Sequence, residues 1–428
     1  MTAPSTTSRT SAAPSAPATC PGPTSGTLSS QRASHASSAR TSRSSPLRAL
    51  SRSSASAAPW CSPPAASAAE PPLQHSLTGS GHAPGRFSLQ GAVHSGVIPT
   101  IAVSMGDPGG IGPEVLVKAL GDTTLRARAR WVVHGLQTPM TLAARAAGIE
   151  PYWSLHASSG PPPGIPGVVL VDHEQLAGPG PWPAHDDSRA GAASLAFLNA
   201  AIADAQRPGP ERARAIVTGP ISKAAWALAG ERRFHGHTEL LAHRFGDAPH
   251  AMMFASPVLN VILVTAHVPL ARVPGLLNPQ HIARTIRLGH DAMRTLAGSS
   301  PRIAVCGVNP HAGESGLLGD EDARLIAPAI ESAKREGIDA SGPFPADTIF
   351  LRALSGSARR FDLVVAMYHD QGLIPLKLLA RDTAVNMTVG LPVPRTSPDH
   401  GTAFDIAGRN LADPGSMRAA CEMAVRLA

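Results

Sequence analysis

From Pro99 onward, short apolar runs alternate with longer segments whose apolar residues recur at helical spacing. The apolar runs, which predict buried strands, are residues 100–104, 131–134, 167–171, 214–218, 258–265, 302–306 and 362–366. The segments with helical spacing are residues 114–120, 138–147, 190–205, 279–296 and 320–335. Strands that alternate with helices in this way form βαβ units around a mostly parallel sheet. We therefore expect an α/β fold, in which ligands bind beyond the carboxyl ends of the strands.

Residues 1–97 differ in composition from the rest of the chain. Ser, Ala, Pro and Thr dominate this segment, and its seven arginines are accompanied by a single acid, Glu70. Such a composition cannot bury enough apolar surface to fold, so we expect a disordered extension ahead of a folded body at residues 98–428. We expect the extension to be a targeting peptide or, as we favour, a translated region upstream of the true start.

Charge and composition limit the classes of partner. The extension carries six of the seven net positive charges, which leaves the body close to neutral. A nucleic-acid-binding body would show a basic patch, and none is visible. No apolar run is long enough to span a membrane, and none of the four cysteines forms a CxxC pair. We therefore expect a cytoplasmic protein that binds neither nucleic acid nor membrane.

Three of the expected strands are followed by loops that carry a histidine. These residues are His267, His311 and His369. The carboxyl ends of parallel strands meet at one edge of a sheet, so three imidazoles there can share one divalent metal ion and leave positions open for substrate. A single histidine of this kind is more often a local hydrogen-bonding residue, but three in equivalent positions favour a metal site.

A second group of residues suits the binding of an anion. His237 and Thr238 lie at the expected start of a helix, whose free N–H groups attract negative charge. Lys377, Asn386 and Arg395 follow later in the chain, and arginine is suited to a bidentate grip on phosphate or carboxylate. Each residue alone has an ordinary alternative as a helix cap or a solvated surface charge.

Together these motifs resemble those of 4-hydroxythreonine-4-phosphate dehydrogenases, from about Pro99 to the C-terminus. The motifs in chain order are MGDPGGIGPE (105–114), VTGPISK (217–223), GHTE (236–239), TAHVPL (265–270), NPHAGE (309–314), GPFPADT (342–348), MYHDQG (367–372) and VNMTVGLPVPRTSPDHGTAFDIAG (385–408). Their number and order make a chance match improbable. The extension at residues 1–97 has no counterpart in the resemblance.

The resemblance implies roles for individual residues. It implies that one divalent metal ion, zinc, magnesium or cobalt, is bound by His267, His311 and His369. It implies substrate contacts at His237, Thr238, Lys377, Asn386 and Arg395. The group that takes the substrate proton stays open among Lys377, Asp347 and Asp370. The alternative role of the two aspartates is helix capping or orientation of a metal-bound histidine.

A wider kinship concerns the cofactor. Residues 106–114 are similar to the GDGIGPE loop of isopropylmalate and isocitrate dehydrogenases, and residues 399–408 resemble their HGSAPDIAGK loop. This similarity implies that NAD or NADP is bound by His400, Gly401, Thr402 and Asp405. It also implies an isopropylmalate-dehydrogenase-like body of two α/β subdomains. The active site would lie in the cleft between them and be completed at a homodimer interface.

The implied reaction is the oxidation of 4-phosphooxy-L-threonine in the biosynthesis of pyridoxal 5′-phosphate. The nearest alternative is a dehydrogenase of 4-phospho-D-threonate or 4-phospho-D-erythronate in sugar-acid catabolism. A phosphate acetyltransferase on a similar scaffold and a non-catalytic binder are further alternatives. The three histidines and the 399–408 loop argue against the transferase, and the presence of every site residue argues against the binder.

Overall fold

A computed structural model describes residues 98–157, 167–234, 236–354, 360–381 and 383–428. The expected disordered extension at residues 1–97 lies outside the described residues. By their contacts, the described residues belong to one compact unit. The division of the body into two subdomains stays a prediction. No helix in the described part of the chain is both long enough and apolar enough to cross a membrane.

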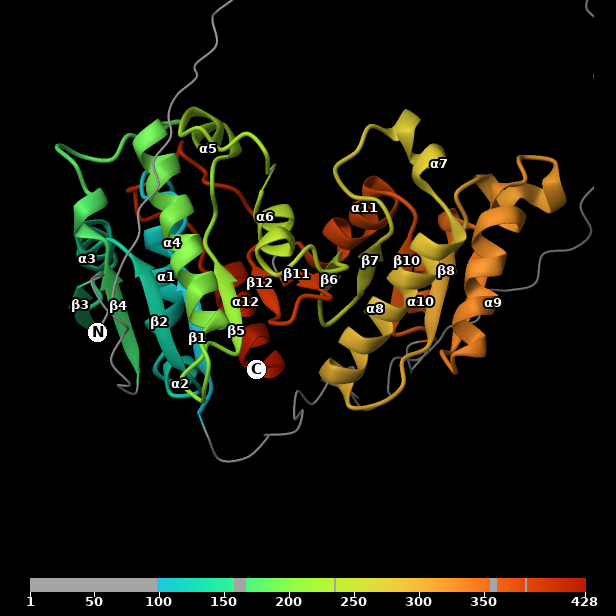
Figure 1. Ribbon diagram of the computed structural model, residues 1–428, viewed down its shortest axis with the longest axis horizontal. Helices are drawn as coiled ribbons and strands as arrows, with labels where there is room; N and C mark the ends of the chain where they lie inside the picture. Colours follow the sequence, from blue (N-terminus) through green and yellow to red (C-terminus); the bar gives the residue numbers. More distant parts are fainter. Residues whose placement is uncertain (1–97, 158–166, 235, 355–359, 382) are drawn as a thin grey trace, which may run out of the picture. The chain divides into compact units, whose positions relative to one another are not determined.

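One sheet of twelve strands runs through the described residues in the order β3-β4-β2-β1-β5-β12-β11-β6-β7-β10-β8-β9 (Figure 1). The strands are β1 (Thr100–Ser104), β2 (Arg130–Gly135), β3 (Trp153–Ala157), β4 (Val168–Asp172), β5 (Ala215–Thr218), β6 (Ala251–Ala255), β7 (Val261–Leu263), β8 (Ile303–Cys306), β9 (Ala340–Phe344), β10 (Leu363–Ala366), β11 (Val385–Val389) and β12 (Arg395–Ser397). The expected α/β fold with a mostly parallel sheet is confirmed.

The direction of the strands changes in the middle of the sheet. The pairs β11–β12, β11–β6 and β6–β7 are antiparallel, whereas the other pairs among the described strands are parallel. Two parallel arms, β3 to β12 and β7 to β9, are therefore joined through β11 and β6. Such a switch in strand arrangement is where open α/β sheets bind ligands.

The helices fall between the strands, as the apolar spacing predicts. They are α1 (Gly112–Leu120), α2 (Thr123–Arg126), α3 (Gln137–Ala147), α4 (Ser188–Gln206), α5 (Lys223–Leu228), α6 (His237–Arg244), α7 (Val273–Leu276), α8 (Pro279–Ala297), α9 (Ala327–Arg335), α10 (Ala346–Leu354), α11 (His369–Ala380) and α12 (Gly415–Leu427). Most ends differ from the expected ones by a few residues, because caps and fraying decide where a helix stops. The helix expected at residues 320–335 begins with a π-helical segment, Asp322–Ile326, and α9 follows it.

The expected long strand at residues 258–265 is wrong in its length, since only Val261–Leu263 forms β7. The residues before it form a turn, in which the Ser256 hydroxyl accepts hydrogen bonds from the backbone N–H groups of Val258 and Leu259. Serine competes with strand hydrogen bonding in this way and favours turns. An apolar run alone does not show such a turn.

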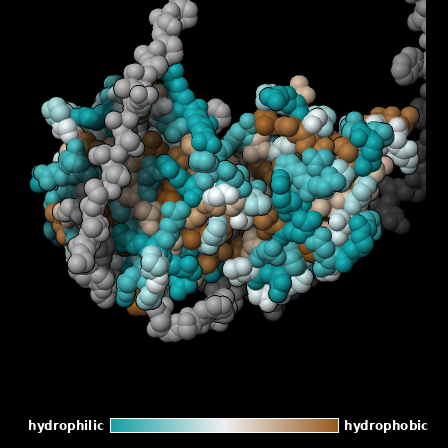
Figure 2. Space-filling model, viewed as in Figure 1, coloured by the Kyte–Doolittle hydropathy of each residue, from teal (hydrophilic) through white to brown (hydrophobic). Residues whose placement is uncertain are grey.

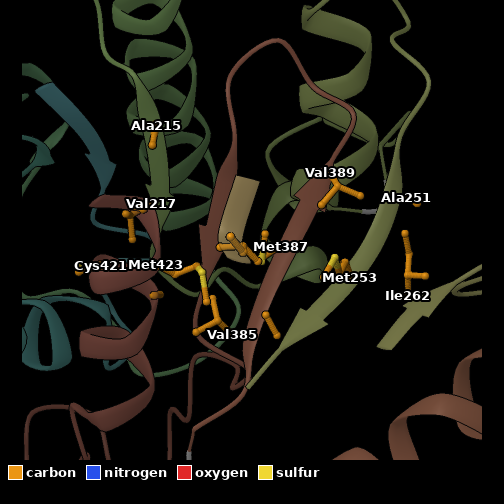
Figure 3. Packing of buried hydrophobic residues seen from close by; sticks show 14 of the residues in the cluster. Ala215, Val217, Ala251, Met253, Ile262, Val385, Met387, Val389, Cys421 and Met423 are labelled. Carbon is orange, nitrogen blue, oxygen red and sulfur yellow. The ribbon is translucent and has the colours of Figure 1, made fainter. Parts of the chain in front are cut away.

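A shared core joins the two arms of the sheet. Figure 3 shows side chains of β5, β6, β7 and β11 packed together with Cys421 and Met423 of α12. Met253, Met387 and Val217 are almost completely buried there. Because the antiparallel strands in the middle of the sheet are packed into this core, they hold their side chains firmly at the junction.

Three buried polar side chains are linked in the arm of the sheet that runs from β3 to β12. Asp204 of α4 lies 2.8 Å from Nε2 of His134 on β2, and Nδ1 of His134 lies 3.2 Å from Nε2 of His173. All three side chains are buried. The pKa of His173 is lowered to about 4, mainly by burial and also by the neighbouring His134, while Asp204 opposes the shift.

We expect this histidine to make the protein less stable in acid. Because the pKa of His173 lies below its ordinary value of 6.5, the unfolded chain takes up a proton first as the pH falls. Stability should therefore decrease from about pH 6.5 toward pH 4, by about 2 kcal/mol between pH 7 and pH 5. Urea unfolding of the wild type and His173→Gln at both pH values measures the effect. The variant should lose less stability, whereas the exposed-site control His185→Gln should behave as wild type. Equal losses in wild type and His173→Gln would contradict the assignment.

Candidate functional site

A pocket of about 370 Å³ lies where the two arms of the sheet meet. It is lined by side chains that follow β5 and β7, by the beginnings of α6 and α11, and by β6, β11 and β12. Among the predicted site residues, the pocket brings together His237, Thr238, His267, His369, Lys377, Asn386, Arg395, His400 and Gly401. Nine residues from widely separated positions therefore line one cavity.

The beginning of α6 forms one wall of the pocket. No side chain caps this helix, so its first N–H groups are free to bind an anion. Nε2 of His237 is buried and has no hydrogen-bond partner among the described residues. Burial holds the pKa of His237 well below its usual value, and the charges of Arg395 and Lys223 lower it further. His237 is therefore neutral and can donate or accept a hydrogen bond toward a ligand.

Arg395 supplies a buried positive charge on the same wall. Its side chain is buried, and within the described residues it forms no ion pair with a carboxylate. Burial lowers the pKa of Arg395 to about 9, although the charge of Glu239 raises it. Oδ1 of Asn386 on the neighbouring strand is also buried, and no described residue forms a hydrogen bond with it. A buried charge normally requires an opposite charge, so this arrangement is suited to an anionic ligand.

Lys377 lies on α11 and lines the same pocket as Arg395 of β12. Its Nζ lies 3.1 Å from Oδ2 of Asp399, whose side chain is mostly buried. Of the three residues predicted as catalytic, only Lys377 lines the pocket. Asp347 and Asp370 are exposed, and neither lines the pocket.

Two of the three predicted metal ligands lie together. The rings of His267 and His369 are 5.7 Å apart between centroids, and both line the pocket. Nδ1 of His369 lies 2.7 Å from Oδ1 of Asp370, which fits the alternative role of this aspartate in orienting the histidine. Burial lowers the pKa of His267, Lys223 and His369 lower it further, and Glu239 opposes the shift. The neutral form is the one that binds a metal ion.

The third predicted ligand, His311, does not line the pocket. Its side chain is exposed, and Nδ1 lies 2.5 Å from Oε2 of Glu314. Within the described part of the chain, no group of three His, Cys, Asp or Glu residues could hold a metal ion. One chain thus supplies two imidazoles that fit a divalent metal, and the binding of all three histidines to one ion stays a prediction that requires a ligand from elsewhere.

The predicted cofactor loop packs against the glycine-rich loop. The Ile111 N–H donates to the Thr402 carbonyl oxygen at 2.9 Å, and a Cβ at Gly110 would lie 2.9 Å from the same oxygen. Glycine is therefore required for this close approach. Nε2 of His400 is buried and has no hydrogen-bond partner in the described segments. His400 lines the pocket, whereas Thr402 and Asp405 do not.

Asp107 lies in the same glycine-rich loop. Its Oδ1 accepts a hydrogen bond from the Gly109 N–H at 2.9 Å, while Oδ2 is buried and has no partner within the part of the chain that the structure describes. Burial raises the pKa of Asp107 to about 6, the Gly109 N–H opposes the shift, and Asp186 and Asp187 add to it. Unpartnered polar atoms on both loops fit the binding of a polar cofactor such as NAD(P) between them.

The sequence analysis did not select five polar residues of the pocket. These residues are Thr218, Lys223, Glu239, Ser397 and Asp399. All of them stand inside motifs that the resemblance includes, namely VTGPISK, GHTE and the motif at residues 385–408. The position of each motif after a strand or at the start of a helix is the signal that could have selected them.

Comparison with known proteins decides the family. The family model described as pyridoxal phosphate biosynthetic protein PdxA matches residues 161–424. The chain belongs to this family. The predicted resemblance is thereby confirmed, while the wider kinship with isopropylmalate and isocitrate dehydrogenases stays a prediction.

Individual members of the family are similar over nearly their whole length. The chain is 45% identical over 332 residues to a 4-hydroxythreonine-4-phosphate dehydrogenase of Desulfosudis oleivorans, covering 76% of this chain and 95% of the relative. It is 43% identical over 337 residues to a D-threonate 4-phosphate dehydrogenase of Cupriavidus necator, covering 78% and 98%.

A solved structure of the same family confirms the fold. The 4-hydroxythreonine-4-phosphate dehydrogenase from Burkholderia phymatum is 38% identical, with a TM-score of 0.64, over 77% of this chain and 98% of that one. The relatives thus bear two substrate names, and both name a phosphorylated hydroxy acid.

Proposed function

We propose that this chain is a cytoplasmic, metal-dependent, NAD(P)-linked dehydrogenase of 4-phosphooxy-L-threonine. The product, 2-amino-3-oxo-4-phosphooxybutanoate, loses CO₂ to give 3-amino-2-oxopropyl phosphate in pyridoxal 5′-phosphate biosynthesis. The observation that carries the proposal is a buried arginine without a carboxylate partner, in one pocket with a pair of histidines. The names of the family members supply the substrate class.

The phosphate group is assigned to the wall formed by α6 and β12. The free N–H groups of α6, the Thr238 hydroxyl and the Arg395 guanidinium converge there. A helix N-terminus and an arginine are the two commonest protein partners of phosphate. Binding the phosphate at this wall leaves the hydroxyl-bearing carbon of the substrate toward the histidine pair, and fixed orientation of this kind lowers the barrier to reaction.

The chemistry is assigned to the part of the pocket that contains His267, His369 and Lys377. His267 and His369 would hold a divalent metal, which supplies Lewis-acid stabilisation of a substrate oxygen when bound. NAD(P) between the glycine-rich loop and the loop at residues 399–408 would accept the hydride. Lys377 is the one catalytic candidate on the pocket wall, and we assign proton exchange with the substrate to its Nζ, which Asp399 positions.

A second copy of the chain is proposed to supply His311. Five consecutive residues from His311 to Ser315 have positive φ, and four of them are not glycine. Residues other than glycine hold such a backbone conformation only where the surrounding structure enforces it, often at functional sites. The loop presents His311 to solvent and away from the pair in its own chain.

The proposed homodimer also accounts for an exposed apolar surface on α10 and α11. Both helices pack on one core cluster with their inner faces, yet their outer faces expose large apolar side chains. These side chains are Leu351, Ile374, Leu378 and Leu379, and Leu378 is 82% exposed. Figure 2 shows hydrophobic surface in the part of the molecule where Figure 1 draws α11. Exposed apolar patches commonly mark interfaces between proteins.

The substrate is tested by turnover of the purified full-length chain with NAD⁺ or NADP⁺ and added zinc, magnesium or cobalt. We expect reduction of the nicotinamide with 4-phosphooxy-L-threonine, and little with 4-phospho-D-threonate or 4-phospho-D-erythronate. His369→Ala is the control and should abolish the signal. The Cupriavidus necator relative has D-threonate 4-phosphate in its name. Preference for this compound would show that the proposed substrate is wrong and that the proposed type of reaction is right. No turnover of any of the three would refute the dehydrogenase assignment.

A further inference from the structure

The guanidinium group of Arg395 is held by neutral hydroxyl groups. Oγ1 of Thr218 accepts hydrogen bonds from Nε at 3.0 Å and from Nη2 at 2.6 Å. Oγ1 of Thr388 lies 3.4 Å from Nη1, which is longer than a normal N–H···O bond. Thr218 therefore makes the main contact that orients this side chain.

The strand arrangement explains why Thr218 is placed there. β12 lies between β5 and β11, and Arg395 is paired with Ile216 on one side and Thr388 on the other. Thr218 stands two residues beyond Ile216, so its side chain is on the same face of the sheet as that of Arg395. Both threonines are fully buried, and β branching favours their positions in the strands.

The contact leaves one particular edge of the guanidinium group available. The Nε and Nη2 hydrogens that face Thr218 lie along one edge of the planar group. The other edge, between Nη1 and Nη2, keeps hydrogens that no strong acceptor among the described residues occupies. That edge has the geometry for a bidentate hydrogen bond to two oxygens of a phosphate.

A hydroxyl group at residue 218, in place of a carboxylate, also preserves the positive charge of Arg395. A carboxylate at the position of Thr218 would orient the arginine as well, but it would neutralise the charge that attracts an anion. A hydroxyl oxygen accepts both hydrogen bonds without adding charge. The result is a positive charge that is fixed in direction and not compensated by a direct ion pair.

We propose that Thr218 is a positioning residue for phosphate binding, whose hydroxyl fixes Arg395 so that the Nη1–Nη2 edge is directed at the substrate phosphate. This inference rests on the proposed function only for the identity of the substrate. Binding of inorganic phosphate tests it without turnover.

The test measures the dissociation constant of inorganic phosphate by calorimetry on the full-length protein. Thr218→Val keeps the shape and removes the hydroxyl, and we expect it to weaken phosphate binding about tenfold, the loss typical of one hydrogen-bonding group on a charged partner. Thr218→Ser should restore wild-type affinity. In turnover, the valine variant should raise KM for the phosphorylated substrate by a similar factor and change kcat by less than about threefold.

The matched control is Thr396→Val on the same strand as Arg395. The Thr396 side chain is also fully buried, but its hydroxyl donates to the Ala420 carbonyl oxygen on α12 at 2.8 Å. This variant loses a buried hydroxyl of the same kind and should keep phosphate affinity. Binding of NAD⁺ should be equal in all variants, which separates a positioning effect from general damage to the fold.

Several outcomes would overturn the proposal. One is wild-type phosphate affinity in folded Thr218→Val, and another is an equal loss in Thr396→Val. If the valine variant does not fold, Thr218→Ala removes the acceptor in a smaller side chain, and unchanged affinity in it would refute the proposal instead. Wild-type protein that binds phosphate but oxidises no phosphorylated hydroxy acid would refute the proposed function and leave the role of Thr218 intact.

Discussion

Replacing Arg395 with methionine lowers kcat/KM for 4-phosphooxy-L-threonine by about 10²- to 10³-fold, because a buried charge-assisted contact is worth several kcal/mol. Arg395 is buried and forms no ion pair with any described residue, so the phosphate is the partner that its charge is expected to have. Most of the loss should appear in KM, since the phosphate is bound in both the ground state and the transition state. Steady-state kinetics with the phosphorylated substrate measure it.

The fold should tolerate this change. A buried charge replaced by an apolar side chain of similar length often leaves stability unchanged or raises it. The matched control is Arg287→Met, which removes a partly exposed arginine that is paired with Glu336 and does not line the pocket. Its kcat/KM should equal that of the wild type. Similar kinetics of Arg395→Met and Arg287→Met would show that the phosphate is bound elsewhere.

Alanine at His267 or at His311 should each reduce turnover by about 10³-fold, because each is proposed to ligate a metal that stabilises a developing charge. Mixed dimers of the two variants provide the sharper test. If His311 acts in the site of the partner, a mixed dimer contains one site with all three histidines and one site that lacks two. Random pairing should therefore recover about a quarter of wild-type turnover, because half of the dimers are mixed.

A second mixture serves as the control for this experiment. The ring centroids of His267 and His369 lie 5.7 Å apart in one chain. Dimers of His267→Ala with His369→Ala therefore contain no complete site. That mixture should stay inactive under the same conditions of co-expression and purification. Activity in neither mixture, from chains that are shown to pair, would mean that His311 serves its own chain and that its loop rearranges.

The sequence was sufficient to predict the class of fold and most of the pocket. The runs at residues 100–104 and 302–306 read clearly as strands, because buried parallel strands are continuously apolar. The strands β11 and β12 were not predicted, since residues such as Asn386 and Arg395 interrupt their apolar pattern. The same polar residues are the ones that make these strands part of the site.

The location of His311 could not be predicted in the same way. His267 and His369 follow neighbouring strands of the sheet, β7 and β10, and this adjacency places them together. His311 follows β8, but a turn with positive φ directs the chain away from the pocket. A motif shows the residue type and its order in the chain, whereas the backbone conformation after the strand decides which way the side chain faces. The contact between Arg395 and Thr218 could not be predicted from the sequence either, because the two residues become neighbours only when β12 lies beside β5.

The central claim is that one pocket contains both the phosphate-binding residues and the site of oxidation. The most direct measurement compares nicotinamide reduction by the full-length chain with 4-phosphooxy-L-threonine and with unphosphorylated 4-hydroxy-L-threonine. We predict a kcat/KM at least about 10³-fold higher for the phosphorylated compound. Only this compound gains the several kcal/mol of binding free energy that the wall formed by α6 and β12 contributes. Equal kcat/KM values for the two compounds would contradict the claim.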